Sequence, residues 1–487
     1  MSFNYPFKEI LPVPAILVGE RRITESTGGV HQHIFSASGL PTLNVPLGGV
    51  AEIDAAVKAA RAAAKGWRQL AGNKRRDLML KFADLLQKHA GDIGRIGTAE
   101  SGIPASKAVF LHGAAIDSFR YYAGWADKMT GELIPTWPNQ GLDYATPEPY
   151  GVVGIIIPWN APMGIFGNTV APALAAGNTV VVKPSEFAPF SAMRYGELLL
   201  EAGIPPGVVN IVPGSVEAGH ALVSHPGVNK IHFTGSGATA KAILGAAREN
   251  LTPVGLELGG KSARLVFADC DIDAAARDAI TGAISISGQG CMLGTRVLIE
   301  ASIYDEFVER CKQHMEAVKL GDPYLESTQM GPVINAAACD RIMGIIDGVK
   351  RAGSARLVTG GARLGGELAN GYFIQPTLFA DVDNRSTLGQ NEVFGPVLSL
   401  MKFESDDEAV RIANDTEFGL AAYVHTHDLP RAHRMASQMD VGNVWINGFG
   451  FSASMPFGGV KQSGVGRTGG VHGIHEFTQI KNVWVAT

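Results

Sequence analysis

Cysteine is scarce in this chain. Its 487 residues include only four cysteines, and no two of them have the Cys-x-x-Cys spacing of a zinc site or a redox pair: Cys270, Cys291, Cys311 and Cys339. Such a set supports neither a disulfide framework nor a metal centre, and it favours a reducing, cytoplasmic setting. With 46% hydrophobic residues the chain can instead bury a sizeable core, so we expect a globular protein without disulfides or metal.

Clusters of one charge and long apolar spans are also missing. The formal net charge is −5, and its acidic and basic residues are dispersed, so we expect no nucleic-acid partner. The segment Met1–Pro6 lacks a basic stretch followed by an apolar one, which argues against a signal peptide. Residues 151–182 carry no charge and are numerous enough to cross a bilayer, but three prolines and five glycines interrupt them. We therefore expect no membrane association.

Short β-branched runs alternate with helical patterns from residue 151 onward. The runs are 151–157, 178–182, 208–212 and 230–233, and the helical stretches are about 163–175, 190–203, 216–224 and 237–249. This alternation predicts a parallel, doubly wound sheet that binds ligands beyond the carboxyl ends of its strands. Three of these ends carry polar or glycine-rich residues, which makes them the expected site of a dinucleotide: 158–160, 183–186 and 234–237.

Further patterns flank this region. Amphipathic helices are predicted at 53–67, 73–89 and 106–129, a ribbon at 130–150, and little beyond strand-like alternation in 1–50. After Cys291 we expect strands at 296–299, 355–359, 396–401 and 443–447, with helices at 303–318, 335–352 and 406–414. The fold class is therefore α/β, and we place a domain boundary near Gly259.

Two stretches carry the residues that suggest chemistry. In Gly288-Gln289-Gly290-Cys291 a thiol follows closely spaced glycines, which let the backbone approach a ligand. In Leu256-Glu257-Leu258-Gly259-Gly260 a carboxylate stands between two leucines, and apolar company raises its proton affinity toward the range of a general base. A cysteine taken alone is more often a small buried hydrophobe. Together the two stretches favour a nucleophile and a base that act on a carbonyl.

These stretches resemble the motifs of the aldehyde dehydrogenase superfamily. Glu257–Ser262 is similar to its glutamate motif and Gly288–Cys291 to its cysteine motif, and Cys291 follows Glu257 by 34 positions, a spacing that also fits the family. The resemblance extends from about residue 50 to the end. It implies a doubly wound parallel-sheet cofactor domain (1–129 and 149–258), a second α/β catalytic domain (259–470) and a small β oligomerisation arm (130–148 and 471–487). The arm implies a homo-dimer or homo-tetramer.

The resemblance also implies the reaction. Cys291 would add to an aldehyde to give a hemithioacetal, with its oxyanion held by Asn160 and the Cys291 backbone N–H. Hydride transfer to NAD would leave a thioester, and Glu257 would activate the water that hydrolyses it to the carboxylic acid.

The cofactor site follows from matching motifs. Lys183 and Glu186 look like the residues that hydrogen-bond the adenosine ribose, and a carboxylate there repels a 2′-phosphate, so NAD is favoured with NADP as the alternative. Residues 234–240 open a helix that could offer N–H groups to a pyrophosphate, and Glu392 matches the residue that holds the nicotinamide ribose. The expected cofactor-binding residues are Ile156, Ile157, Pro158, Trp159, Lys183, Ser185, Glu186, Gly214, Phe233, Thr234, Gly235, Ser236, Thr239, Leu258, Gly259, Glu392 and Phe394.

The sequence signals for the substrate pocket are less specific than those for the cofactor site. After Asn160, small side chains recur three to four residues apart, and phenylalanines near residue 450 could form an apolar wall; we expect the pocket to include Ala161, Gly164, Ile165, Asn168, Ser285, Met292, Phe449, Phe451 and Phe457. A wide pocket without a cation suits a bulky apolar or aromatic aldehyde. Close helix packing explains the small residues equally well.

Three other functions compete with this one. A coenzyme-A-acylating relative would transfer the acyl group to CoA, but such enzymes generally lack the base that Glu257 supplies. A catalytically silent binding or structural protein of the same fold would not need Cys291, Glu257 and Asn160 together. A cofactor-free cysteine hydrolase would need a histidine base, and none of the 13 histidines lies in a comparable motif. Aldehyde oxidation with NAD is therefore the expected function.

Overall fold

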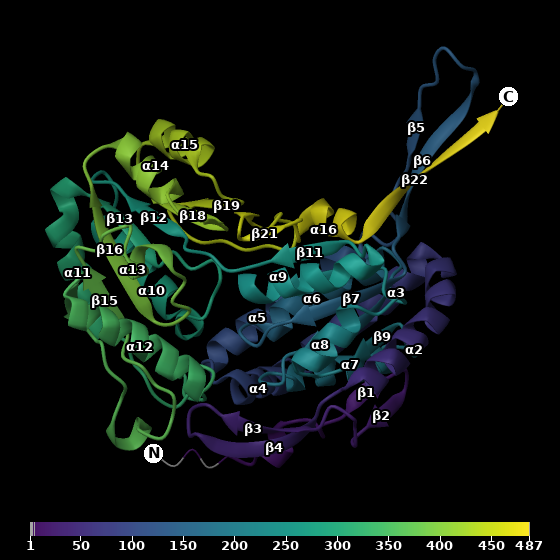
Figure 1. Cartoon of the computed structure of the whole chain (residues 1–487), viewed down its shortest axis with the longest axis horizontal. Helices are drawn as coiled ribbons and strands as arrows, with labels where there is room; N and C mark the ends of the chain where they lie inside the picture. Colours follow the sequence, from purple (N-terminus) through teal and green to yellow (C-terminus); the bar gives the residue numbers. More distant parts are fainter. Residues whose placement is uncertain (1–2, 4, 487) are drawn as a thin grey trace.

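An eight-stranded sheet organises the first half of the chain (Figure 1). The computed structural model describes residues 3 and 5–486, so the outermost residues of the expected ranges 1–129 and 471–487 lie outside the described residues. In sheet order the strands are β2 (Arg21–Ile23), β1 (Ile16–Val18), β9 (Val209–Ile211), β8 (Thr179–Pro184), β7 (Val152–Ile157), β10 (Lys230–Thr234), β11 (Val254–Glu257) and β21 (Gly464–Val465). The five strands from β9 to β11 run parallel, which confirms the predicted fold class.

Helices cover both faces of this sheet. One face packs on α3 (Gly72–Lys88), α5 (Ala105–Ala123), α6 (Pro162–Ala175) and α7 (Phe190–Glu201), and the other on α2 (Val50–Gln69), α8 (Val216–Val223) and α9 (Gly237–Ala247). Successive strand side chains point to opposite faces, so Val180 and Val182 join the first cluster while Val181 joins the second. Every residue of β7 and β8 is buried, as parallel strands covered on both faces require.

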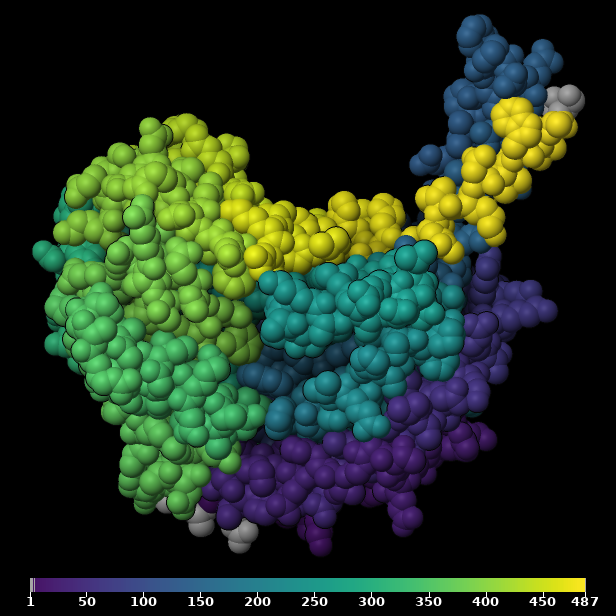
Figure 2. Space-filling view, viewed as in Figure 1, coloured from purple at the N-terminus to yellow at the C-terminus, as the bar shows by residue number. Residues whose placement is uncertain are grey.

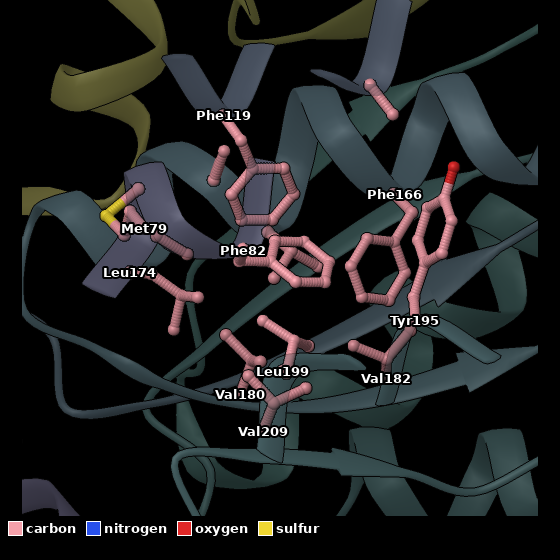
Figure 3. Close-up of a cluster of buried hydrophobic side chains, with 14 of the residues drawn as sticks. Met79, Phe82, Phe119, Phe166, Leu174, Val180, Val182, Tyr195, Leu199 and Val209 are labelled. Atoms are coloured by element: carbon pink, nitrogen blue, oxygen red, sulfur yellow. The ribbon is translucent and has the colours of Figure 1, made fainter. Parts of the chain in front are cut away.

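Aromatic side chains fill the first cluster (Figure 3). Phe82 of α3 meets Phe119 of α5 edge-on at a centroid distance of 4.6 Å, and Phe166 of α6 meets Tyr195 of α7 at 5.1 Å. All four rings are fully buried. Truncating one such phenylalanine to alanine typically costs about 3–5 kcal/mol, so this cluster fixes α6 against β7 and β8.

A seven-stranded sheet organises the second half (Figure 1). Its order is β14 (Arg356–Thr359), β15 (Thr377–Ala380), β16 (Val397–Phe403), β13 (Arg296–Glu300), β12 (Ala263–Val266), β18 (Ala421–His425) and β19 (Asn443–Ile446). Its larger helices are α10 (Ile272–Ile284), α11 (Tyr304–Glu316), α12 (Ala336–Ala352), α14 (Asp406–Asn414) and α15 (Leu429–Gln438). Four of these helices begin at a side-chain cap, which satisfies an otherwise free N–H: Asp271, Asn335, Ser405 and Asp428.

A three-stranded ribbon stands away from both sheets (Figures 1 and 2). It consists of β5 (Glu132–Ile134), β6 (Gly141–Pro149) and β22 (Thr478–Ala486), with β6 in the middle, and α16 (Gly470–Glu476) leads into β22. The predicted ribbon at 130–150 and the C-terminal strand therefore pair with each other, over nine registered residue pairs.

Several elements differ from the sequence expectations. The helix predicted to reach residue 129 ends at Ala123, and α4 (Ala90–Ser101) was not predicted. The segment 1–50 contains α1 (Phe7–Ile10), strands β1 and β2 of the first sheet, and the hairpin β3 (Val30–Phe35) and β4 (Leu40–Pro46). Small elements α13 (Thr387–Gln390), β17 (Phe418–Gly419) and β20 (Val460–Lys461) complete the second half.

The chain crosses back to the first sheet near its end. Strand β21 pairs with β11 although residues 259–470 were expected in the second unit. Gly464 makes this contact: its φ is +139°, and a Cβ atom there would lie 2.1 Å from the carbonyl oxygen of Leu256. Only a residue without a side chain allows that approach.

The uncharged stretch 151–182 folds as β7, α6 and the beginning of β8. In the described part of the chain, no helix is both long and apolar enough to cross a membrane.

Candidate active site

A cavity of about 310 Å³ brings together residues that lie far apart in the sequence. Strands β7, β10 and β11 all end at it, as the rule for ligand sites of parallel sheets predicts. It is lined by Pro158, Trp159, Asn160, Ile165, Thr234, Gly235, Ser236, Glu257, Leu258, Gly259, Cys291, Arg341, Glu392 and Phe394. The three expected catalytic side chains therefore share one cavity.

The loop before Cys291 has a strained backbone. Ile286, Ser287 and Gly288 have φ values of 44°, 58° and 73°, a left-handed conformation that is rare for a β-branched residue. The Ser287 hydroxyl donates to the carbonyl of Gly331 at 2.9 Å. Gly288 packs so tightly on Gly395 that a Cβ atom would lie 2.1 Å from its carbonyl carbon. The loop is therefore clamped from two sides.

Asn160 is anchored to the same loop. Its Nδ2 donates one hydrogen to the carbonyl of Gln289 at 2.8 Å, two residues before Cys291. The Gln289 side chain in turn accepts a hydrogen bond from the Ile334 N–H at 2.9 Å. Because an amide nitrogen carries two hydrogens, one N–H of Asn160 stays available to a ligand in the cavity.

Burial dominates the proton affinity of both central groups. Burial, with smaller contributions from the Glu392 and Glu257 carboxylates, raises the pKa of the Cys291 thiol to about 12. It also raises the pKa of Glu257 well above its usual value, a rise that Arg467 opposes. Among residues 3 and 5–486, neither carboxyl oxygen of Glu257 has a hydrogen-bond partner. At neutral pH the Cys291 thiol therefore holds its proton, which it must lose before it can act as a nucleophile.

Glu392 closes the cavity on the side of the second sheet. The Gly260 N–H donates to its Oε1 at 3.0 Å. Burial raises the pKa of Glu392 to about 7, against the opposing effects of this N–H, Lys261 and Arg341. Phe394 meets the Trp159 ring edge-on at a centroid distance of 5.6 Å. An ionisable carboxylate and an aromatic edge thus face the same space.

A second cavity, of about 390 Å³, adjoins the first and shares five lining residues with it, from Pro158 and Trp159 and from Thr234–Ser236. At its far end the Lys183 ammonium donates to the carbonyls of Pro184, at 3.3 Å, and Gly214. Burial lowers the pKa of Lys183 to about 8, and Glu186 works in the opposite direction. The N-terminus of α9 opens onto the cavity where Ser236 caps the helix.

The comparisons with known proteins agree with this geometry. The model of the "Aldehyde dehydrogenase family" matches residues 24–483. Aldehyde dehydrogenase 1A1 of Gallus gallus is 43% identical over 469 residues, which are 95% of this chain and 91% of the relative. Among solved structures, betaine aldehyde dehydrogenase of Staphylococcus aureus in complex with NAD⁺ has a TM-score of 0.96 at 33% identity and covers 99% of this chain and 96% of its own. The NAD⁺ complex of aldehyde dehydrogenase from Bacillus cereus has a TM-score of 0.95 at 36% identity, with 99% of each chain covered. The chain belongs to the aldehyde dehydrogenase family.

As an NAD-dependent aldehyde dehydrogenase, the enzyme must hold a dinucleotide, and the second cavity fits one. Its donor set suits a ribose, because a lysine ammonium and the Glu186 carboxylate lie beside each other at one end. The N-terminus of α9 suits a pyrophosphate, because the space that a Cβ atom on Gly237 would occupy is open. Of the 17 expected cofactor residues, 16 line the two cavities, and the other, Gly214, accepts the Lys183 hydrogen bond.

The expected substrate residues of this aldehyde dehydrogenase are less tightly grouped. Ile165 lines the cavity of Cys291. Met292 and Phe457 pack against a cluster that contains Tyr423 and Trp445. Phe449 extends the cluster, with its ring 5.2 Å from that of Trp445, and Phe451 is half-buried. Ser285 ends α10, and Ala161 precedes α6.

On α6 the small residues face α5. The Asn168 Oδ1 accepts a hydrogen bond from the Ser118 hydroxyl at 2.7 Å. A Cβ atom on Gly164 would contact only Leu111 of α5, at 3.7 Å, which is ordinary van der Waals distance. Asn168 therefore serves helix packing, while the space beside Gly164 accepts an added carbon atom.

The sequence interpretation missed residues on three helices. Val216, Gly219, His220 and Val223 of α8, together with Ala242, Ile243 and Ala246 of α9, line the second cavity. Their spacing of three and four residues is the signal that could have found them once the two helices were placed. Arg341 of α12 lines the first cavity and donates to the Val393 carbonyl at 2.7 Å. Nothing in its local sequence distinguishes it from a surface arginine.

Proposed function

We propose that this enzyme oxidises a bulky apolar or aromatic aldehyde to its carboxylic acid, with Cys291 as nucleophile, Glu257 as the base for hydrolysis and Asn160 as an oxyanion donor. The observation that carries the proposal is the shared cavity of these three side chains, next to a second cavity that suits a dinucleotide. We further propose that residues 1–129 and 149–258 bind the cofactor and that 259–470 supply the nucleophile.

The first half of the proposed reaction forms a carbon–sulfur bond. Cys291 loses its proton, and its Sγ adds to the aldehyde carbon. The negative charge that develops on the aldehyde oxygen meets the free N–H of Asn160 and the backbone N–H of Cys291, and one such donor is worth about 3–4 kcal/mol. Bound NAD supplies the nicotinamide that accepts the hydride, which leaves an acyl group on Cys291 as a thioester.

The second half breaks that bond. Glu257 takes a proton from a water molecule, and the resulting hydroxide adds to the thioester carbon. The carbon–sulfur bond then breaks, the acid leaves, and the Cys291 sulfur takes back a proton from Glu257, which restores both groups. The apolar surroundings of Glu257 support this role, because they give the carboxylate the proton affinity that a base needs near neutral pH.

Two variants test the assignment of roles. Cys291→Ala should abolish NADH formation and leave NAD binding intact, whereas Cys270→Ala, a partly exposed thiol elsewhere, should change neither. Glu257→Gln should slow turnover and let an acyl adduct accumulate on Cys291, which mass spectrometry of the intact protein detects. Substantial turnover by Cys291→Ala, or an unchanged kcat in Glu257→Gln, would contradict the proposal.

The substrate proposal rests on the apolar cluster of Met292, Phe457 and Phe449 and on the space beside Gly164. Gly164→Leu should lower kcat/KM for benzaldehyde far more than for acetaldehyde, because the added side chain occupies that space. Equal losses for both aldehydes, or a wild-type preference for acetaldehyde, would favour helix packing as the reason for the small residue.

We propose that the ribbon of β5, β6 and β22 joins subunits into a homo-dimer or homo-tetramer. The ribbon carries Leu133 and Ile480 at exposures of 74% and 70%, and the loop between β5 and β6 carries Trp137 at 91%, which is unusual for large apolar side chains on a projecting element. Light scattering after chromatography should give the mass of at least two chains, and Leu133→Lys with Ile480→Lys should reduce it. A wild-type mass of one chain would refute this assignment.

A further inference from the structure

A second buried carboxylate lies close to the proposed base. Glu476 is the last residue of α16 and is 9% exposed. Its Oε1 forms an ion pair with the Lys230 ammonium at 2.8 Å and lies 3.5 Å from Nδ1 of His232. Lys230 and His232 are themselves buried on β10. None of these three residues has a part in the reaction proposed above.

Two glycines make the space for this carboxylate. A Cβ atom on Gly255 of β11 would lie 1.9 Å from Oε1 of Glu476, and one on Gly466 would lie 2.6 Å from its Oε2. Both distances are shorter than any real contact, so the carboxylate occupies the places where these two residues would otherwise carry side chains.

The position of Gly255 relates Glu476 to Glu257. Gly255 and Glu257 are two positions apart on β11, so they face the same side of the sheet, and their Cα atoms are about 7 Å apart. On the neighbouring strand, Gly464 pairs with Glu257, and Gly466 follows two positions later on that side. Glu476 therefore takes the next same-face place beside Glu257, in surroundings that exclude most water.

The other charges around Glu257 are few. Arg467 donates to the carbonyls of Gly459 and Gly466 at 2.7 and 2.8 Å, and its charge lowers the proton affinity of Glu257. Cys291 and Glu392 face it from the cavity. Behind Glu476 stand Lys230 and His232, and Tyr150 lies under the Lys230 ammonium at 5.5 Å. Glu476 is thus a buried carboxylate that acts on Glu257 from outside the cavity of Cys291 and Glu392.

We propose that Glu476 is a positioning residue for the hydrolytic half of the reaction: its carboxylate, held by Lys230 in the space left by Gly255 and Gly466, sets the pH at which Glu257 can take a proton from water. The inference rests on the proposed role of Glu257. Burial opposes the ionisation of Glu476, but His232 and Lys230 outweigh it and hold the pKa of Glu476 below its usual value. A carboxylate that stays ionised across the working range keeps the proton affinity of Glu257 high.

The test is the pH dependence of thioester hydrolysis, followed as the decay of the acyl adduct on Cys291 after a single turnover. Glu476→Gln removes the negative charge and should move the acid limb of the profile to lower pH by about one unit. This is the size that the Coulomb energy of one charge gives at roughly the 7 Å spacing of residues 255 and 257, with Lys230 offsetting part of it in the wild type. Lys230→Met with Glu476→Gln should shift the acid limb in the same direction without leaving a buried lysine unpaired. Glu476→Asp keeps the charge and should stay close to wild type.

Glu100→Gln is the control for the loss of a buried carboxyl group elsewhere, because Glu100 is also buried but belongs to α4. It should lower the melting temperature without moving the acid limb. An acid limb that stays in place in Glu476→Gln and in the double variant, or a Glu476→Asp variant as impaired as Glu476→Gln, would overturn the inference in favour of a purely structural ion pair. Failure of the proposed function is distinguishable, because Glu257→Gln would then still hydrolyse its adduct.

Discussion

Replacing Ile286 with glycine separates backbone strain from side-chain packing in the loop that carries the proposed nucleophile, Cys291. Ile286 has φ 44° and ψ 39°, five residues before Cys291. A non-glycine residue held in this region costs about 1–3 kcal/mol, and glycine adopts it freely. Against this gain, glycine lowers the free energy of unfolding by up to about 1 kcal/mol, because it gives the unfolded chain more freedom. Removal of the partly buried isoleucine side chain lowers it by about 1 kcal/mol more.

These terms nearly cancel. We expect Ile286→Gly to change the free energy of unfolding by less than about 1 kcal/mol, whereas truncation of an unstrained core isoleucine to alanine alone costs about 2–5 kcal/mol. The effect on activity should be larger. A relaxed loop holds the Gln289 carbonyl, and with it Asn160, less firmly, so we expect kcat to fall about tenfold, equivalent to about 1.4 kcal/mol of lost transition-state stabilisation.

Leu251 offers a matched control. It has φ 52° and ψ 34° and is 87% exposed on the surface, far from Cys291 in the sequence and outside both cavities. Leu251→Gly relieves similar strain without losing packing, so it should stabilise the protein by about 1 kcal/mol and leave kcat unchanged. Denaturant unfolding and steady-state NADH formation measure both quantities. A loss of about 3 kcal/mol or more in Ile286→Gly, or an equal loss of kcat in Leu251→Gly, would refute the strain argument.

Two further predictions concern stability and the cofactor. Asp278 lies against the buried Arg264 and 3.3 Å from His425, contacts that outweigh its desolvation and hold its pKa at about 2. Because the folded pKa lies below the unfolded value of about 3.9, the contribution of Asp278 to the free energy of unfolding is complete above pH 4 and is lost as the pH falls toward 2. Asp278→Asn should lower the free energy of unfolding by about 3 kcal/mol at pH 7, and denaturant titrations should show a flatter loss of stability between pH 4 and pH 2. Glu186→Gln should raise kcat/KM with NADP relative to NAD, because it removes the carboxylate that repels a 2′-phosphate, and a wild-type enzyme already faster with NADP would contradict this.

The sheets were predictable because their signals are local. The β-branched run at 230–233 became β10, and the amphipathic pattern at 53–67 became the centre of α2. Helix α4 was missed because its glycines lower the intrinsic helix propensity. One of them is required by a distant contact, since a Cβ atom on Gly97 would lie 2.5 Å from the Met163 Cε. Packing of this kind has no sequence signature near residue 97.

The same limit applied at the active site. The rule that ligands bind beyond the carboxyl ends of parallel strands predicts dinucleotide contacts at 156–159 and 183–186, because each group includes the carboxyl end of a strand, β7 or β8. Arg341 follows no strand, and it reaches the cavity only because α12 packs beside the segment of Glu392 and Phe394. A residue whose place depends on how one helix packs cannot be found from a motif.

Glycines account for much of the electrostatic environment that the sequence did not reveal. A Cβ atom on Gly259 would lie 2.3 Å from Oε2 of Glu392, just as Gly255 and Gly466 leave room for Glu476. Each of the two carboxylates therefore occupies the volume of an absent side chain beside the strand that bears Glu257, although 133 residues separate Gly259 from Glu392 in the chain. Alanine at residue 259 or 255 would force out one carboxylate and leave the other, so each glycine controls one of the negative charges that act on Cys291 and Glu257. A glycine in this enzyme can thus determine the protonation of a residue it never contacts.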